Sequence, residues 1–163
     1  MKTILLISDT HNLLDDFIIN HISSVDEVWH AGDVGEVEIH DQIQNLKPLK
    51  MVYGNIDNHK LRAIVPKNQI FDCEGIKVFM THIGGYPKRY EKNIKEELLQ
   101  VKPDLFISGH SHILKVIPDK SLNLIHMNPG AAGKHGFHKK RTMLKFSITN
   151  GIIQDLYVIE KDK

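Results

Sequence analysis

The sequence predicts an α/β fold of two β-sheets packed face to face, with helices on the outer faces. Strand-like apolar runs alternate with single helices in the first third of the chain, which is typical of βαβ units. The last third is rich in strands that crossover helices cannot all connect. We therefore expect a parallel first sheet and a mostly antiparallel second sheet. The 163 residues suit one compact domain over residues 1–163.

The first third contains three predicted strands. The apolar run over residues 3–8 predicts a buried strand, and the helical spacing of apolar side chains over residues 13–22 predicts a helix. Two further strands are expected over residues 28–31 and 49–53, and a helix is expected to begin near Glu36. This order gives two consecutive βαβ units.

The remaining elements are a hairpin, a helix and a series of strands. Residues 69–72 and 76–80 predict a hairpin, and a helix is expected over residues 88–101. A two-residue hairpin turn is expected at Asn150-Gly151. The other expected strands cover residues 104–108, 115–118, 122–127, 142–148 and 152–159.

Composition limits the classes of function. Lys and Arg number 21 and Asp and Glu number 20, so the net charge of +1 gives no signal for a nucleic-acid partner. The single cysteine, Cys73, fits a reducing compartment, and a cytoplasmic location is expected. No segment approaches the roughly 20 apolar residues of a membrane helix, so no membrane partner is expected. The sequence does not determine the oligomeric state, and a homo-oligomer is possible.

Polar motifs follow three of the predicted parallel strands. They are Asp9-Thr10-His11, Gly32-Asp33 and Gly54-Asn55-Ile56-Asp57. Open α/β sheets place ligands at the carboxyl ends of their strands. Loop composition or helix capping explains each motif alone. Neither explains why such residues recur at the same edge of the sheet.

Histidines follow two further strands. His82 ends one strand, and Gly109-His110-Ser111-His112 follows another. Residues i and i+2 of an extended chain point to the same side, so His110 and His112 are expected to project together, as are Asp9 and His11. The seven candidate metal ligands are Asp9, His11, Asp33, Asn55, His82, His110 and His112.

This donor set predicts two divalent metal ions. Nitrogen and oxygen donors without thiolate suit Mn, Fe, Zn, Co or Ni better than a structural zinc, and manganese is the first expectation. Seven ligands are too many for one tetrahedral ion. Two ions roughly 3.5–4 Å apart support in-line displacement at phosphorus. Their +4 charge exceeds the −2 of two aspartates, so a small phosphoester is the expected substrate.

With these motifs assembled, the chain resembles the calcineurin-like metallophosphoesterases. Their signature is Asp-x-His, Gly-Asp, Gly-Asn, a later His, and Gly-His-x-His, and its order is kept here from residue 9 to residue 112. Asn128-Pro129-Gly130 also resembles the segment that follows the last motif. The short chain is most similar to the small prokaryotic phosphodiesterase branch without a cap domain. The resemblance implies a four-layer αββα fold.

The resemblance also implies two ligand sets and a reaction. Asp33 would bridge the two metals, and a metal-bridging hydroxide would hydrolyse phosphodiesters, and also phosphomonoesters, without a protein nucleophile. One set is Asp9, His11, Asp33 and His112, and the other is Asp33, Asn55, His82 and His110.

Two positions depart from the patterns of larger relatives. Many of them carry a histidine directly after the Gly-Asn asparagine, where this chain has Ile56. No general acid is therefore assigned, and Asp57 and His59 are the candidates. Purple phosphatases have a tyrosine ligand where Glu36 stands here, so an Fe(III)–tyrosinate site is not expected.

Two other functions are alternatives to phosphoester hydrolysis. A non-catalytic scaffold is the alternative, because a subunit of the retromer coat resembles this fold, but the ligand set here is intact. A nuclease is less favoured because nuclease relatives usually carry extra domains and the net charge is only +1.

The histidines outside the motifs receive structural interpretations. His30 is expected behind Asp33, and His21, His40 and His126 at the surface or in packing. The basic segment over residues 134–141 is interpreted as a solvated hairpin loop rather than a substrate contact.

Overall fold

The computed structural model describes all 163 residues and contains two five-stranded sheets. The first sheet has the order β12-β11-β1-β2-β3 and the second β4-β5-β8-β10-β9. In the first sheet the strands are β1 (Lys2–Ile7), β2 (Glu27–His30), β3 (Leu49–Met51), β11 (Lys140–Thr149) and β12 (Ile152–Asp162). In the second they are β4 (Asn68–Cys73), β5 (Ile76–Thr81), β8 (Leu105–Ile107), β9 (Leu114–Asp119) and β10 (Leu124–Pro129).

Both sheets are mixed, so the expectation of one parallel and one mostly antiparallel sheet is wrong. β1, β2 and β3 are parallel, but β11 pairs antiparallel with β1 and carries β12 at the edge. In the second sheet β5, β8 and β10 are parallel, and β4 and β9 flank them antiparallel. Local sequence patterns identify strands but do not show which strands pair with one another. The last hairpin, formed by β11 and β12, belongs to the first sheet.

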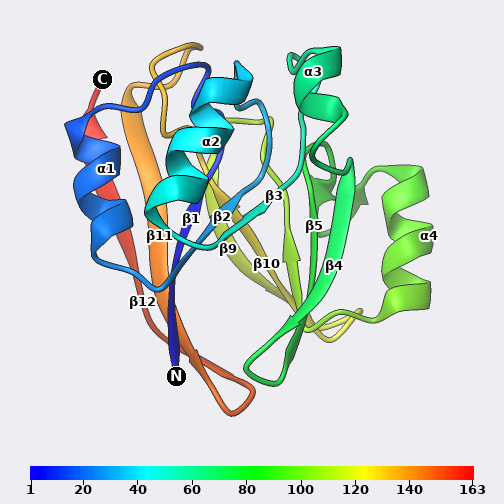
Figure 1. Cartoon of the computed structure of the whole chain (residues 1–163). Helices are drawn as coiled ribbons and strands as arrows, with labels where there is room; N and C mark the ends of the chain where they lie inside the picture. Colours follow the sequence, from blue (N-terminus) through cyan, green and yellow to red (C-terminus); the bar gives the residue numbers. More distant parts are fainter.

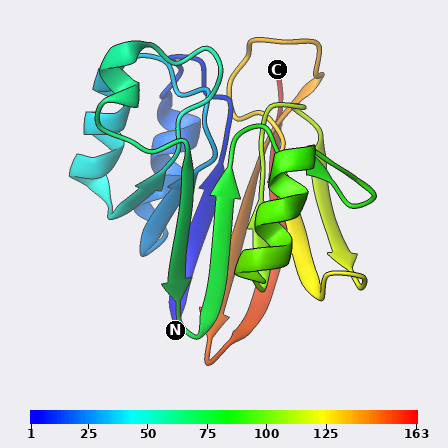
Figure 2. The same ribbon diagram turned by 90° about the vertical axis from the view of Figure 1, so that its right-hand side faces the viewer.

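Helices cover the outer face of each sheet, as predicted. α1 (Asp16–Ser23) and α2 (Val37–Leu46) lie beside the first sheet, and α4 (Lys92–Val101) lies beside the second (Figures 1 and 2). The short helix α3 (His59–Arg62) was not expected. None of the four helices is long and apolar enough to span a bilayer.

The apolar side chains form three layers of core. On β1, Ile4 and Leu6 contribute to the cluster between the sheets, whereas Leu5 and Ile7 contribute to the cluster under α1 and α2. A third, smaller cluster joins α4 to the second sheet through residues such as Phe106. This period-2 division of β1 explains why its sequence is a continuous apolar run.

Local differences from the predicted elements have backbone causes. Asp15 has an extended backbone (φ −91°, ψ 175°), so α1 begins only at Asp16, and the Asp15 side chain caps the helix by accepting a hydrogen bond from Ile18 N. The predicted start of α4 is occupied by the small hairpin of β6 (Gly85–Tyr86) and β7 (Arg89–Tyr90). The Asn150-Gly151 turn is confirmed, with φ 48° and 79° as a type I′ turn requires.

The topology brings distant segments to one edge. The parallel strands β1, β2 and β3 end at the same edge of the first sheet. β5 and β8 likewise run parallel in the second sheet, and residues 130–139 after β10 form a loop at the top of the view in Figure 1. The polar motifs follow these strand ends, so the fold places them around one opening.

Candidate metal centre

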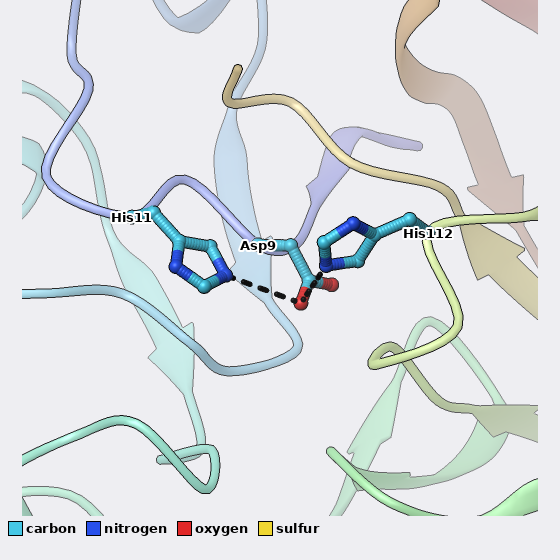
Figure 3. Close-up of side chains that lie close together, drawn as sticks. All are labelled: Asp9, His11 and His112. Carbon is cyan, nitrogen blue, oxygen red and sulfur yellow. Dashed lines mark hydrogen bonds and ion pairs between the residues drawn. The ribbon is translucent and has the colours of Figure 1, made fainter. Parts of the chain in front are cut away.

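Six of the seven candidate ligands form two adjoining clusters. Within each cluster one ligand atom from every residue lies within 4.8 Å of the others. Figure 3 shows the first cluster, in which the rings of His11 and His112 approach the same carboxylate oxygen of Asp9 from opposite sides. The clusters are Asp9, His11 and His112, and Asp33, His82 and His110. This division matches the two sets that the resemblance implies, while metal binding by these residues stays a prediction.

Asp9 is fully buried, and its two carboxylate oxygens contact different groups. Oδ2 accepts hydrogen bonds from Ser8 Oγ at 2.6 Å and from His110 N at 3.2 Å. Oδ1 lies 3.1 Å from His112 Nε2 and 3.9 Å from Nε2 of both His11 and His82. The donors on Oδ2 therefore orient Oδ1 toward the imidazoles.

Asp33 is arranged in the same way between the clusters. Its Oδ1 accepts a hydrogen bond from Ile56 N at 3.1 Å. Its Oδ2 lies 3.5 Å from His11 Nε2 and 3.2 Å from His82 Nε2. One oxygen thus faces a histidine from each cluster, which is the placement that a bridging ligand requires.

The unpaired nitrogens fit a divalent cation. His82 Nδ1 lies 2.7 Å from the Ala31 carbonyl oxygen, to which it donates in the tautomer that leaves Nε2 with its lone pair. Nε2 of His82 and Nε2 of His11 are buried without a hydrogen-bond partner. Metal bonds of about 2.0–2.2 Å place neighbouring ligands roughly 3–3.6 Å apart, close to the distances from these nitrogens to Asp33. The residues present therefore suit a metal.

The two carboxyl groups are held ionised. Burial acts to raise the pKa of Asp9, but the neighbouring imidazoles of His11, His112 and His82 outweigh it and hold the pKa well below its usual value. Burial of Asp33 also acts to raise its pKa, but the imidazole of His82, 3.2 Å away, outweighs this effect, so the pKa of Asp33 is lowered. Asp9 in turn raises the pKa of His11. Protons and a metal ion therefore compete for the same imidazole nitrogens.

The backbone at the site differs from the extended form that the sequence suggested. φ is positive at five candidate ligands. Left-handed residues other than glycine each cost about 1–3 kcal/mol and cluster at functional sites. The i, i+2 side chains do converge, but through left-handed turns rather than a strand pleat. The five are Asp9 (54°), His11 (44°), Asp33 (53°), His110 (70°) and His112 (59°).

Glycines of two motifs let the backbone pass directly against these carboxylates. A Cβ on Gly54 would collide with Asp33 Oδ1, and a Cβ on Gly109 would collide with Ser8 Oγ and crowd Asp9 Oδ2. Steric crowding therefore explains why glycine precedes Asn55 and His110 in these two motifs.

Asn55, the seventh candidate, lies on the loop after β3. It is exposed and lines a cavity of about 590 Å³ together with Asp33 and His110. Arg62 Nη2 donates to its carbonyl oxygen at 3.2 Å, which fixes the backbone of the loop. Asn55 thus faces the same space as the two clusters.

Neither suggested general acid is placed to act as one. Asp57 is buried, and its carboxylate accepts hydrogen bonds from Gly54 N (2.7 Å), Gly35 N (2.9 Å) and Val34 N (3.2 Å). It joins the Asp33 loop to the Asn55 loop. His59 is exposed on α3 and does not line the cavity. The geometry disfavours both residues as the general acid, and that role stays a prediction.

The loop over residues 130–139 contributes two histidines that the sequence analysis missed. The ring of His135 stacks on His11 with centroids 4.7 Å apart, and the ring of His138 meets His112 edge-on at 5.1 Å. Both line the cavity. Residues 134–137, 139 and 140 are exposed, so the loop is solvated, as interpreted, and it also borders the cavity. Arg141, at the end of the basic segment, is buried. The missed signal was two histidines three residues apart after Asn128-Pro129-Gly130.

His30 lies behind the site, as expected. Its Nδ1 accepts from Gly32 N at 3.2 Å, and its Nε2 lies 2.9 Å from Thr10 Oγ1. Complete burial lowers its pKa to about 3, so it is neutral and ties the Asp9 loop to the Asp33 loop. His126 is buried in β10, in agreement with a packing position.

Paired aspartate–histidine clusters at the strand ends of a two-sheet sandwich are typical of metal-binding proteins. The chain belongs to the calcineurin-like phosphoesterase superfamily, whose domain model matches residues 1–151. It is 28% identical over 133 residues to a probable metallophosphoesterase of Methanothermobacter thermautotrophicus, covering 77% of this chain and 74% of the relative. A probable metallophosphoesterase of Methanocaldococcus jannaschii is 30% identical over 132 residues, with 77% and 66% covered.

Solved structures show the same fold. A novel archaeal phosphodiesterase superposes with a TM-score of 0.71 at 19% identity, covering 96% of this chain and 99% of that chain. Wild-type Vps29 of Entamoeba histolytica, complexed with Zn²⁺, gives a TM-score of 0.74 at 15% identity, with 98% of both chains covered. These likenesses confirm the predicted sandwich flanked by helices.

Proposed function

We propose that this protein is a metal-dependent phosphodiesterase that holds two divalent ions, manganese first, and acts on small phosphoesters. The observation that carries the proposal is the position of Asp33 Oδ2 between His11 Nε2 (3.5 Å) and His82 Nε2 (3.2 Å). A carboxylate shared by two histidine clusters suits a pair of ions rather than one. The family membership and the phosphodiesterase of the same fold support the reaction class.

The chain's own residues would orient the reaction. When bound, the two ions would lower the pKa of a shared water molecule, making it the nucleophile, and offset the charge on the phosphoryl oxygens. Ser8 and the backbone of His110 fix Asp9, and the backbone of Ile56 fixes Asp33. The cavity lined by Asn55 and His135 receives the ester. No protein nucleophile is required.

The test is hydrolysis of a bis-aryl phosphodiester by metal-stripped protein with and without Mn²⁺. We expect Mn²⁺ to restore activity and Asp33→Asn to lower it by more than about 100-fold, since loss of a bridging ligand exceeds the 10–100-fold effect of its supporting residues. Asp72→Asn, at an exposed position of β4, is the matched control and should behave as the parent protein. A phosphomonoester assayed in parallel reports the breadth of the reaction.

A non-catalytic scaffold is the second candidate function, and the fold that the chain shares with Vps29 favours it. The paired clusters weigh against a scaffold, because a protein that only presents a surface needs neither left-handed ligand residues nor unpaired buried imidazoles. Equal rates for the parent protein and Asp33→Asn, or no hydrolysis despite bound metal, would favour the scaffold.

A further inference from the structure

A second cavity lies beside the metal centre, under the β6–β7 hairpin. Its volume is about 330 Å³, and its lining includes Arg89, Lys115 and His126, which together with His110 and Ser111 define what we call the hairpin cavity. His110 and Ser111 also line the cavity of the metal centre. The two cavities therefore adjoin across the Gly109–Ser111 segment.

His126 is an unpartnered polar group in the wall of the hairpin cavity. Its side chain is fully buried, and neither ring nitrogen has a hydrogen-bond partner. Burial lowers the pKa of this imidazole to about 4, so at neutral pH it offers one N–H donor and one acceptor. Leaving such a group unpaired destabilises the folded chain, and a ligand that pairs with it recovers that loss.

Two cations accompany His126. Lys115 Nζ lies 3.6 Å from the centroid of the Tyr86 ring, which holds the ammonium group in place, and Arg89 stands on the facing strand of the hairpin. Neither cation forms an ion pair within the chain. Glu91 is the one carboxylate in the lining, so the side chains of the cavity carry a net charge of +1. This charge favours an anion.

The hairpin that roofs the cavity is anchored at both ends. Ser108 Oγ donates to Gly85 O at 3.2 Å, and Tyr90 OH donates to Asp119 Oδ2 at 2.7 Å. Asn128, below it, uses its side chain for Gly109 O, Ser111 Oγ and Gly130 N. The space is thus formed before a ligand arrives, which lowers the entropic cost of binding.

We propose that the hairpin cavity binds a second anionic group, a phosphate or a carboxylate, carried by the same molecule as the ester that the metal centre cleaves. The imidazole N–H of His126 donates to an anion oxygen, while Lys115 and Arg89 supply the charge. The bound substrate lies over His110 and Ser111, with one end in each cavity. The proposal that this anionic group belongs to the cleaved ester rests on the proposed function. Anion binding in the hairpin cavity does not.

The first test is binding of inorganic phosphate to metal-stripped protein, followed by NMR at the ring signals of His126. We expect these signals to shift on titration, and an acetate titration run in parallel shows whether carboxylate binds as well. Lys115→Met should weaken binding about tenfold, the effect of losing one charge-assisted hydrogen bond. Lys120→Met, in the exposed turn between β9 and β10, is the matched control and should bind phosphate unchanged.

His126→Phe separates a binding role from a packing role. The phenyl ring keeps the planar contact with Phe106, whose centroid lies 5.3 Å from that of His126, and removes the unpaired nitrogens. We expect the variant to melt at a higher temperature and to bind phosphate at least about tenfold more weakly. Unchanged binding in this variant, or shifts confined to His110 and His112, would overturn the proposal.

Kinetics distinguish this proposal from the proposed function. For a phosphodiester whose alcohol carries a carboxylate, Lys115→Met should lower kcat/KM about tenfold more than for its uncharged analogue. Metal-dependent hydrolysis without any response of His126 to phosphate or acetate would overturn the hairpin cavity alone. A response of His126 in a protein that hydrolyses no diester would support the cavity and contradict the proposed function.

Discussion

Arg141, near the start of β11, and Asp15, the N-cap residue of α1, form a two-point ion pair. Arg141 Nη1 lies 2.8 Å from Asp15 Oδ2, and Nη2 lies 3.0 Å from Oδ1. The guanidinium also donates through Nε to Ala132 O at 2.6 Å. Because Arg141 follows the loop that carries His135 and His138, the pair fixes one end of that loop over the metal centre.

The first prediction concerns this pair. Asp15→Asn keeps an N-cap acceptor for α1 but leaves a buried guanidinium without a counter-ion, so we expect a loss of about 2–3 kcal/mol in the free energy of unfolding. Asp15→Ala should lose about 1 kcal/mol more because the cap is also removed. Denaturant unfolding measures both. A fully stable Asp15→Asn variant would show that the pair does not support the fold.

Ser8 provides the second prediction. Its hydroxyl orients Asp9 at 2.6 Å and is fully buried, so Ser8→Ala should weaken the apparent affinity for Mn²⁺ by about 10–100-fold without unfolding the protein. Activity measured against Mn²⁺ concentration gives this affinity. Ser23→Ala, on the exposed surface of α1, is the control. Identical Mn²⁺ curves for Ser8→Ala and the control would remove Ser8 from the supporting set.

The third prediction is a pH dependence of stability that comes from His126. Its folded-state pKa of about 4 lies below the ordinary value of 6.5, so the unfolded chain binds a proton at a higher pH than the folded chain. Stability from this group is therefore complete above pH 6.5 and is lost as the pH falls toward 4.

The difference can be measured against His126→Phe. Between about pH 7.5 and about pH 5, the parent protein should lose about 2 kcal/mol more unfolding free energy than the variant, whose position 126 does not titrate. Denaturant unfolding at the two pH values gives both numbers. Parallel losses in the two proteins would show that His126 is not held neutral by burial.

The fourth prediction concerns the leaving group. Ile56 occupies the position after Asn55, and Asp57 is committed to three backbone donors, so neither supplies a proton to the departing oxygen. We expect kcat/KM for a series of aryl phosphodiesters to fall steeply as the pKa of the leaving phenol rises. A flat series would contradict this. If His135→Gln made that flat series steep, the proton donor would be His135.

Part of this protein is determined by local sequence. The run after Lys2 alternates between two cores, and Asn150-Gly151 reverses the chain, because strand period and turn chemistry depend on adjacent residues. The candidate ligands could also be identified from the sequence, since Asp9, Asp33 and His110 each follow a strand. The order of strands in each sheet could not be predicted from local sequence, because β11 pairs with β1, which lies more than 130 residues earlier in the chain.

The geometry of the site was decided only by the tertiary structure. The left-handed backbone at Asp9 and His110 persists because packing and hydrogen bonds across the two sheets hold it, and no local propensity favours it. The loop with His135 reached His11 because β10 and β11 belong to different sheets and the connection between them crosses the edge where the motifs meet. Sequence spacing determined which residues face this edge, whereas long-range packing decided which of their atoms meet.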